Sequence, residues 1–290
     1  MRTNTPDKIR FFSLPDLPYV QCVYGTNVTN EFSRHVHNGF SIGIILKGER
    51  VIVRNGTVSI IPENSVFVIN PGESHTCKSR CEKHSYFTIC VDTESIYAIV
   101  SQMSEKAEAL PYFTNILIHD TELSLKIRQF LSLAENASST LERESVLVSL
   151  LSTLILRHGD KPPKLCRIGS HVDAINRACE FMETHYDENM SLKQLSRVAC
   201  LSPFYFQRLF LKNKGISPHE YLVHFRIKIA RNFLDEGQNI VGVAFDTGFV
   251  DQSHFNRSFK SVVGITPGLY LQSREMHHYE KVSKPNGKSS

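Results

Sequence analysis

The sequence predicts an α+β protein, in which a small β-barrel or jelly roll and two helices precede an all-α domain. Two observations lead to this fold class. Between residues 19 and 92, short β-rich runs alternate with turn residues, as they do in small barrels. Between residues 192 and 271, a helical pattern repeats at a spacing of 49 residues (255 − 206 = 49). A repeat at a fixed spacing indicates one structural unit used twice.

Length and composition are those of an ordinary globular protein. The chain has 290 residues, 41% of them hydrophobic and 21% charged, which is enough for two domains. It has no run of about 18 apolar residues, and Met1–Asp7 lacks a signal-peptide core, so we expect a cytoplasmic protein without a membrane partner. The seven cysteines are odd in number and scattered, which favours reduced thiols over disulfides.

The first domain is expected to contain six short strands. Asn55-Gly56 lies between two β-rich runs and is a strong hairpin signal. The segment Arg2–Pro18 fits either an arm over the barrel or an ordinary first strand. The expected strands are Tyr19–Tyr24, Ser41–Lys47, Arg50–Arg54, Thr57–Ile61, Ser65–Ile69 and Ser85–Val91.

Three histidines mark this barrel. His35 and His37 are two positions apart, so in a strand their side chains point to the same face. His75 follows the turn Pro71-Gly72-Glu73-Ser74. The arrangement resembles the cupin family, whose barrels carry His-x-His, then an acidic residue, and later another histidine. In this chain Ser41 stands where the acid is expected.

The resemblance implies that the three histidines line a cavity. Three imidazoles can hold Zn, Fe or Mn with open positions, but the missing carboxylate counts against a metal. We therefore predict a pocket without metal or cofactor, in which His35, His37 and His75 bind a small-molecule effector. Histidines that are only packed or hydrogen-bonded are the alternative.

A second group combines Cys77, Cys81 and His84. Its spacing is compatible with zinc, but a fourth ligand would have to come from elsewhere in the chain. We interpret it as a loop with two unrelated thiols.

Two helices are expected after the barrel, at residues 121–136 and 142–157, where apolar residues recur at helical spacing. In the second helix the apolar stripe alternates steps of three and four, as a coiled-coil seam does. We favour a homodimer seam there over simple packing on the barrel. The stripe consists of Leu147, Leu150, Leu151, Leu154 and Ile155.

Two prolines separate the halves of the chain. In Lys161-Pro162-Pro163-Lys164 a helix cannot continue, which indicates a semi-rigid linker. The expected organisation is a first domain at residues 1–160, a linker at 161–169, a helical domain at 170–275 and a polar tail at 276–290.

Each copy of the repeat is predicted to form two helices joined by a short turn. Ser202 caps the second helix of the first copy, with Pro203 at its first position, and Asp251 caps the equivalent helix of the second copy. Tyr221–Leu234 forms a single helix between the copies. Helix, short turn and second helix is the helix-turn-helix motif.

Residues 172–272 resemble the DNA-binding domain of the AraC/XylS family of bacterial transcription regulators, and the cupin-like first domain is a common sensor half in that family. Cys200 departs from the family pattern, because glycine often stands there. The motifs that carry the resemblance are Ser202-Pro203, Phe206-Gln207-Arg208-Leu209-Phe210, Gly215-Ile216-Ser217-Pro218, Asp251-Gln252-Ser253, Arg257-Ser258-Phe259-Lys260 and Gly264-Ile265-Thr266-Pro267.

The distribution of charge fits a polyanion partner. Between Lys193 and Arg231 the chain has eight basic residues and one acid (8 − 1 = +7), whereas residues 1–160 have 15 basic and 17 acidic residues (15 − 17 = −2). A solvated helix face explains such a block equally well. The resemblance favours double-stranded promoter DNA as the partner.

The resemblance implies that the second helix of each copy enters a major groove. Gln207 suits adenine, Arg208 suits guanine and Phe204 suits the thymine methyl group. The residues expected at base edges are Phe204, Gln207, Arg208, Gln252, Ser253, Asn256 and Arg257. The residues expected at phosphates are Lys193, Lys212, Lys214, Lys228 and Lys260. The alternative for each is a solvated polar residue.

The resemblance therefore implies a ligand-responsive transcription regulator without catalytic residues. Regulators of this family are more often activators, and we expect a homodimer with RNA polymerase as a further partner. One alternative is a metal-dependent cupin enzyme with a helical accessory domain. Another is an architectural DNA binder without sequence preference.

Overall fold

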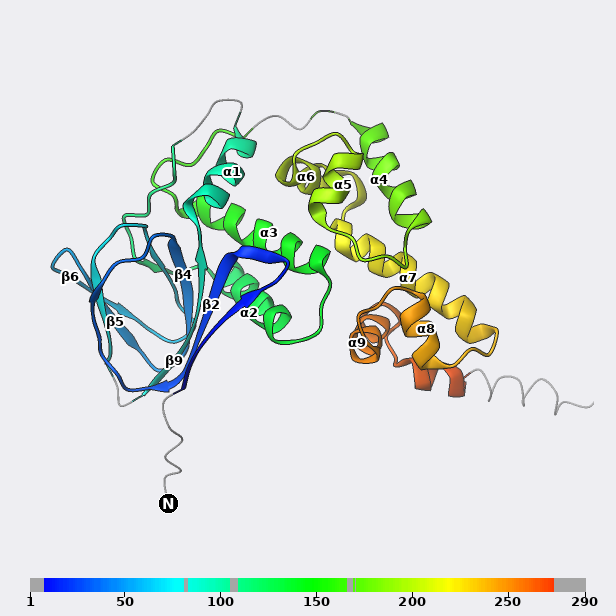
Figure 1. Cartoon of the computed structure of the whole chain (residues 1–290), viewed down its shortest axis with the longest axis horizontal. Coiled ribbons are helices and arrows are strands. Elements are labelled where there is room, and N and C mark those ends of the chain that lie inside the picture. Colours follow the sequence, from blue (N-terminus) through cyan, green and yellow to red (C-terminus); the bar gives the residue numbers. More distant parts are fainter. Residues whose placement is uncertain (1–7, 81–82, 105–108, 166–168, 170, 274–290) are drawn as a thin grey trace, which may run out of the picture. The chain divides into compact units, whose positions relative to one another are not determined.

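A computed structural model of the chain describes residues 8–80, 83–104, 109–165, 169 and 171–273 (Figure 1). The chain divides into two compact units. The first comprises residues 1–135 and 143–169, and the second comprises residues 136–142 and 170–290. The expected polar tail, Cys81 and Cys166 lie outside the described residues. Within the described ranges, no helix is both long and apolar enough to span a membrane.

Two antiparallel sheets form the first unit (Figure 1). The larger sheet has the order β1-β2-β9-β4-β7-β10 and the smaller has the order β3-β8-β5-β6. Buried side chains from both, such as Ile45 and Ile52, share one apolar core. The strands are β1 (Lys8–Leu14), β2 (Leu17–Val28), β3 (Phe32–His35), β4 (Phe40–Lys47), β5 (Arg50–Arg54), β6 (Thr57–Ile61), β7 (Val66–Ile69), β8 (His75–Ser79), β9 (His84–Val91) and β10 (Leu117–Ile118).

The expected barrel is confirmed, and all six expected strands are present. β5 and β6 have the expected bounds because Asn55 and Gly56, both with positive φ (51° and 78°), make a tight turn between them. Within the segment that fitted either an arm or a strand, Lys8–Leu14 forms β1, which pairs with β2. β3, β8 and β10 were not expected from the sequence.

Where the structure describes this part of the chain, three helices accompany the sheets: α1 (Thr93–Met103), α2 (Thr121–Glu135) and α3 (Thr140–His158). The sequence predicted α2 and α3 but not α1. The dimer seam proposed for α3 is wrong, because its five-residue stripe is 0–1% exposed in the single chain. Helical periodicity shows which face is apolar, but it does not show what covers that face.

The described residues of the second unit form six helices, and the fold class is therefore the expected α+β. Buried side chains of α7, α8 and α9, such as Ile227, Val243 and Phe259, make one core. The helices are α4 (Val172–Thr184), α5 (Leu192–Val198), α6 (Pro203–Lys214), α7 (Pro218–Asp235), α8 (Ile240–Asp246) and α9 (Gln252–Val263).

The two copies of the repeat have the same helix ends. The side chain of Ser202 accepts a hydrogen bond from the backbone N–H of Tyr205, and that of Asp251 accepts one from His254, which confirms both expected caps. Gly215 and Gly264 end α6 and α9 in the left-handed conformation.

The turns inside the copies differ in length. Four residues, 199–202, connect α5 to α6, whereas five residues, 247–251, connect α8 to α9. Each turn contains one left-handed residue, Cys200 (φ 57°) in the first and Gly248 (φ 76°) in the second. Cys200 therefore adopts the backbone conformation for which glycine is usual.

Candidate ligand cavity and nucleic-acid interface

The three histidines of the barrel come together. His35 pairs with His75 across β3 and β8, and His37 follows β3 in the chain. Their ring centroids are separated by 4.3 Å (His35–His75), 4.9 Å (His35–His37) and 5.1 Å (His37–His75). His37 lies beyond the strand, so the contact does not depend on the shared strand face that the sequence predicted.

Backbone carbonyls orient two of the imidazoles. Nδ1 of His35 lies 2.7 Å from the carbonyl oxygen of Ser33, and Nδ1 of His75 lies 3.0 Å from that of Glu73. A neutral imidazole in this position donates from Nδ1 and keeps a lone pair on Nε2. Nε2 of His75 is buried and has no hydrogen-bond partner.

The environment keeps His37 and His75 uncharged at neutral pH. Burial, followed by the charges of the other imidazoles and of Arg50, lowers the pKa of His37 to about 4. Burial also lowers the pKa of His75, although its hydrogen bond to Glu73 acts in the opposite direction.

The cupin resemblance implies a metal at these histidines, and the donor set fits one only in part. One nitrogen from each of the three side chains lies within 4.8 Å of the others. The position of the missing acid is occupied by Ser41, which is buried and lies 3.6 Å from the sulfur of Cys90. The guanidinium of Arg50 acts on the same imidazoles and opposes a second positive charge. Three imidazoles alone can hold Zn²⁺, so the neighbouring charge of Arg50 is what counts against a metal here.

The second group of potential zinc ligands is not brought together. Cys77 lies in β8, and its thiol is buried. His84 lies in β9 and stacks on Tyr86 with a centroid distance of 5.5 Å. The third member, Cys81, is outside the described residues.

A cavity of about 400 Å³ lies beside the histidines. Among the described residues, its wall includes His35 and His37 but not His75, which is 1% exposed and packs against the other two rings. The wall also contains Arg50, which the sequence analysis missed. A basic residue at the start of a strand carries no signal of burial, so only the fold reveals it.

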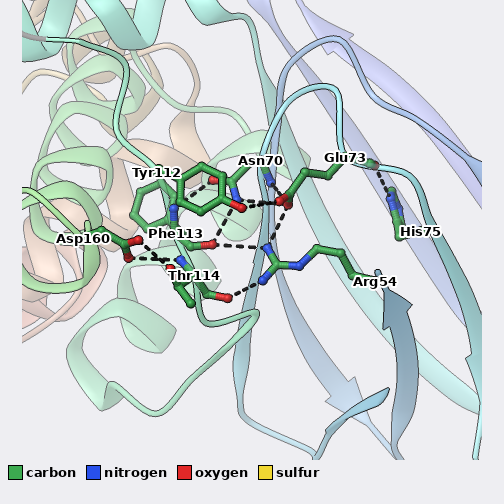
Figure 2. Close-up of polar contacts among 8 residues, drawn as sticks. All are labelled: Arg54, Asn70, Glu73, His75, Tyr112, Phe113, Thr114 and Asp160. Carbon is green, nitrogen blue, oxygen red and sulfur yellow. Dashed lines mark hydrogen bonds and ion pairs between the residues drawn. The ribbon is translucent and has the colours of Figure 1, made fainter. Parts of the chain in front are cut away.

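A polar network supports His75 from outside the cavity (Figure 2). The carboxylate of Glu73 accepts hydrogen bonds from Arg54 Nη1 at 2.8 Å, Tyr112 Oη at 2.7 Å and Asn70 Nδ2 at 3.0 Å. Burial alone would raise the pKa of Glu73, but these three donors outweigh it and lower the pKa. Glu73 is therefore held as a carboxylate two residues from His75.

The network continues to the end of the first unit (Figure 2). Arg54 Nη1 donates to the carbonyl of Phe113 at 3.2 Å, and its other terminal nitrogen donates to the carbonyl of Thr114. The backbone N–H of Thr114 donates to the carboxylate of Asp160 at 3.0 Å. Asp160 N–H in turn donates to the carbonyl of Tyr112 at 2.9 Å. Asp160 immediately precedes the expected linker.

In the first helix-turn-helix, α6 carries three of the residues expected at base edges. The outward placement of Phe204 is wrong, because its side chain is 2% exposed. The guanidinium of Arg208 lies 5.4 Å from the Phe204 ring centroid, so Phe204 supports Arg208 instead. Gln207 and Arg208 are half-buried and Leu211 is exposed.

The remaining expected DNA contacts lie mostly at the surface of the second unit. In α9, Gln252, Ser253 and Arg257 are exposed and Asn256 is half-buried. All five lysines expected at phosphates have exposed side chains: Lys193, Lys212, Lys214, Lys228 and Lys260.

One member of the basic block has an internal position that the charge count did not reveal. Arg226 in α7 is 3% exposed and donates to the carbonyls of Tyr186 at 2.6 Å and Glu188 at 2.7 Å. Burial lowers its pKa to about 10, so it is charged at neutral pH. Arg226 thus joins the linking helix to the loop before α5, where it is not available to phosphates.

Comparisons with known proteins match both units. Residues 17–151 match the AraC-like ligand binding domain family, and residues 195–273 match a helix-turn-helix domain family. YbfI of Bacillus subtilis (strain 168), an uncharacterized HTH-type transcriptional regulator, is 31% identical over 228 residues, which cover 78% of this chain and 82% of that protein.

More distant similarities have the same character. An uncharacterized HTH-type transcriptional regulator of Staphylococcus aureus (strain COL) is 24% identical over 254 residues, and the chain spans only 32% of its length. A solved AraC-type DNA-binding regulator from Chromobacterium violaceum is 25% identical, with a TM-score of 0.34, and the match covers 36% of this chain and 93% of that one. On the two family matches and the Bacillus relative, the chain is not an enzyme and belongs to the AraC/XylS family of transcriptional regulators, with a ligand-binding domain followed by a helix-turn-helix DNA-binding domain.

Proposed function

We propose that the protein is a sequence-specific transcriptional activator in the cytoplasm whose DNA binding responds to a small molecule in the barrel cavity. The observation that carries the proposal is the cavity of about 400 Å³ lined by His35 and His37, inside the AraC-like ligand-binding region. The exposed polar residues of α9 and the half-buried Gln207 and Arg208 of α6 supply the DNA-reading side chains. The active species is a homodimer that contacts RNA polymerase.

The polar network is the proposed route from the cavity to the linker at residues 161–169. A molecule against His35 and His37 also acts on His75, whose ring packs against both. His75 is oriented by the carbonyl of Glu73, and the Glu73 carboxylate is bound to Arg54. A movement of Glu73 and Arg54 changes the contacts that hold Asp160 before the linker.

Sequence-specific binding is tested first. Genome-wide mapping of bound DNA identifies sites, and fluorescence anisotropy then compares a mapped site with an unrelated duplex of the same length and salt. We expect affinity for the mapped site about 10³-fold or more above that for the unrelated duplex. Equal affinity for both would support the architectural binder instead.

The proposed route is tested with Asp160→Asn. The variant loses the carboxylate that accepts from Thr114, so we expect ligand binding in the cavity to persist while reporter transcription no longer responds to ligand. Glu94→Gln removes an exposed carboxylate at the start of α1 and should respond as the wild type does. A normal response in the Asp160 variant would exclude this route.

A further inference from the structure

A buried guanidinium lies in the wall of the barrel cavity. Arg50 begins β5, is 6% exposed and lines the cavity. Its guanidinium carbon lies 4.1 Å from the ring centroid of Tyr86, 5.4 Å from that of Phe32 and 5.6 Å from that of Phe67. These rings hold the charged group inside the barrel instead of letting it extend into solvent.

Arg50 has no carboxylate partner among the residues that the structure describes. Its side-chain hydrogen bonds go to Cys77 and Tyr86, and its Nε is buried without a partner. Arg54, on the same strand, differs because it is paired with Glu73 at 2.8 Å. A buried cation without a counter-charge is costly, so this cavity favours a negative charge.

The other groups of the cavity leave that charge uncompensated. His37 is neutral at neutral pH because its pKa is lowered to about 4, first by burial and then by neighbouring charges that include Arg50. Glu31 also lines the cavity, but its side chain is exposed and makes no ion pair with Arg50. Among the described residues of the wall, Arg50 is therefore the buried charged group.

We propose that the effector is a small organic acid whose carboxylate binds the guanidinium of Arg50. The inference rests on the proposed function of the cavity as an effector site. A planar guanidinium presents donors in the geometry that a carboxylate accepts. A carboxylate brings one negative charge against one guanidinium, whereas a phosphate brings nearly two.

The rest of the wall defines the body of the acid. The rings of Phe11, Phe32 and Tyr86 offer apolar contacts, and Ser41 and Thr88 offer hydroxyl groups. About 400 Å³ lies near the lower end of the range for small-molecule sites, which restricts the ligand to a small, mainly apolar body.

Matched pairs of ligands that differ in charge but not in shape test the proposal. Thermal shift and calorimetry on the full chain, in buffer with EDTA, compare benzoate with benzamide, 4-hydroxybenzoate with 4-hydroxybenzamide, and hexanoate with hexanamide. We expect at least one acid to raise the Tm and to bind about 10- to 100-fold more tightly than its amide, as for a hydrogen bond to a charged group.

Variants assign the effect to Arg50. Arg50→Met preserves much of the side-chain volume, and its affinity for the acid should be about 10- to 100-fold lower than that of the wild type. Arg34→Met removes an exposed arginine of β3 that does not line the cavity, and it should bind the acid as the wild type does. If circular dichroism shows that Arg50→Met does not fold, acid binding is measured with Arg50→Lys instead. It keeps the charge but not the paired donors, and we expect weaker acid binding.

Several results would overturn the proposal. These are equal binding of acids and amides, undiminished acid binding in the Arg50 variants, binding by none of the acids, or binding of inorganic phosphate alone. Binding of Zn²⁺ without EDTA, and of no acid, would identify a metal site instead. DNA affinity is measured on the same preparations, to separate the organic-acid proposal from the proposed function as a DNA-binding regulator. If specific DNA binding is intact but no acid binds, only the proposed class of ligand is overturned.

Discussion

At the scale of single residues, Gly248 combines a left-handed backbone with a close contact that leaves no room for a side chain. Its φ is +76°, and an added Cβ would lie 2.6 Å from the carbonyl oxygen of Asp187 and 2.8 Å from Nη2 of Arg226. The side chain would strain the backbone and also displace the arginine that holds the loop before α5. Gly248→Ala should therefore lower the free energy of unfolding by about 3 kcal/mol, measured by urea denaturation.

Gly215→Ala is the matched control for this prediction. Gly215 also has a positive φ, +73°, but its Cβ would meet no atom within 4 Å. We expect it to cost about 1–2 kcal/mol, which is the backbone strain alone. Equal losses in the two variants would mean that the contact with Asp187 and Arg226 does not matter.

Single residues also show what a sequence conveys about a site. Caps such as Ser202 and turns such as Gly248 were predictable because their chemistry is local. Burial is not local: Phe204 was expected to face outward and is 2% exposed, and the charge count did not reveal that Arg226 is 3% exposed. Arg50 was missed for the same reason, since its environment is formed by residues from other strands.

At the scale of elements, the histidine cluster between β3 and β8 makes the barrel sensitive to acid. The pKa of His37 is about 4 in the folded chain, against an ordinary value of 6.5, and the pKa of His75 is also lowered. Below pH 6.5 the unfolded chain binds protons that the folded chain does not bind. Stability should therefore be intact above about pH 6.5 and fall as the pH drops towards 4.

Urea midpoints between pH 7 and pH 4.5 measure this loss. His37→Gln removes one of the titrating groups, so its midpoint should fall less over that range than that of the wild type. Protonation of Glu73 and other carboxylates contributes to both proteins and cancels in the difference. Parallel profiles would show that His37 does not titrate as described.

Elements with a strong local signal were predictable. The bounds of β5 and β6 follow from Asn55-Gly56 between alternating runs. β3 and β8 are short and carry polar residues, and they are stabilised by pairing with each other. The leucine stripe of α3 was correctly read as helical, but it is buried within the chain.

At the scale of the whole molecule, the repeat places two similar modules on one chain with unequal charge. Residues 193–231 carry a net charge of +7, whereas residues 240–271 have two basic and two acidic residues (2 − 2 = 0). Phosphate attraction does not depend on sequence, so the first module should supply most of the affinity. The second module, whose net charge is zero, should mainly adjust which sites are chosen. The duplication was visible in the sequence, whereas the extra residue in its second turn required the structure.

Two variants of α6 distinguish the recognition of bases from the attraction of phosphates. Arg208→Ala should cost about 1–3 kcal/mol on the cognate duplex and relax the preference at one base pair, because a guanidinium reads guanine through two acceptors. Lys212→Ala, at an exposed position, should weaken binding equally on all duplexes and reduce the salt slope by about 1. Anisotropy with singly substituted duplexes at several salt concentrations measures both effects.

Melting curves control for the loss of the Arg208–Phe204 contact. If Arg208→Ala weakened every duplex alike, Arg208 would be a phosphate contact, and base reading in the first module would rest on Gln207.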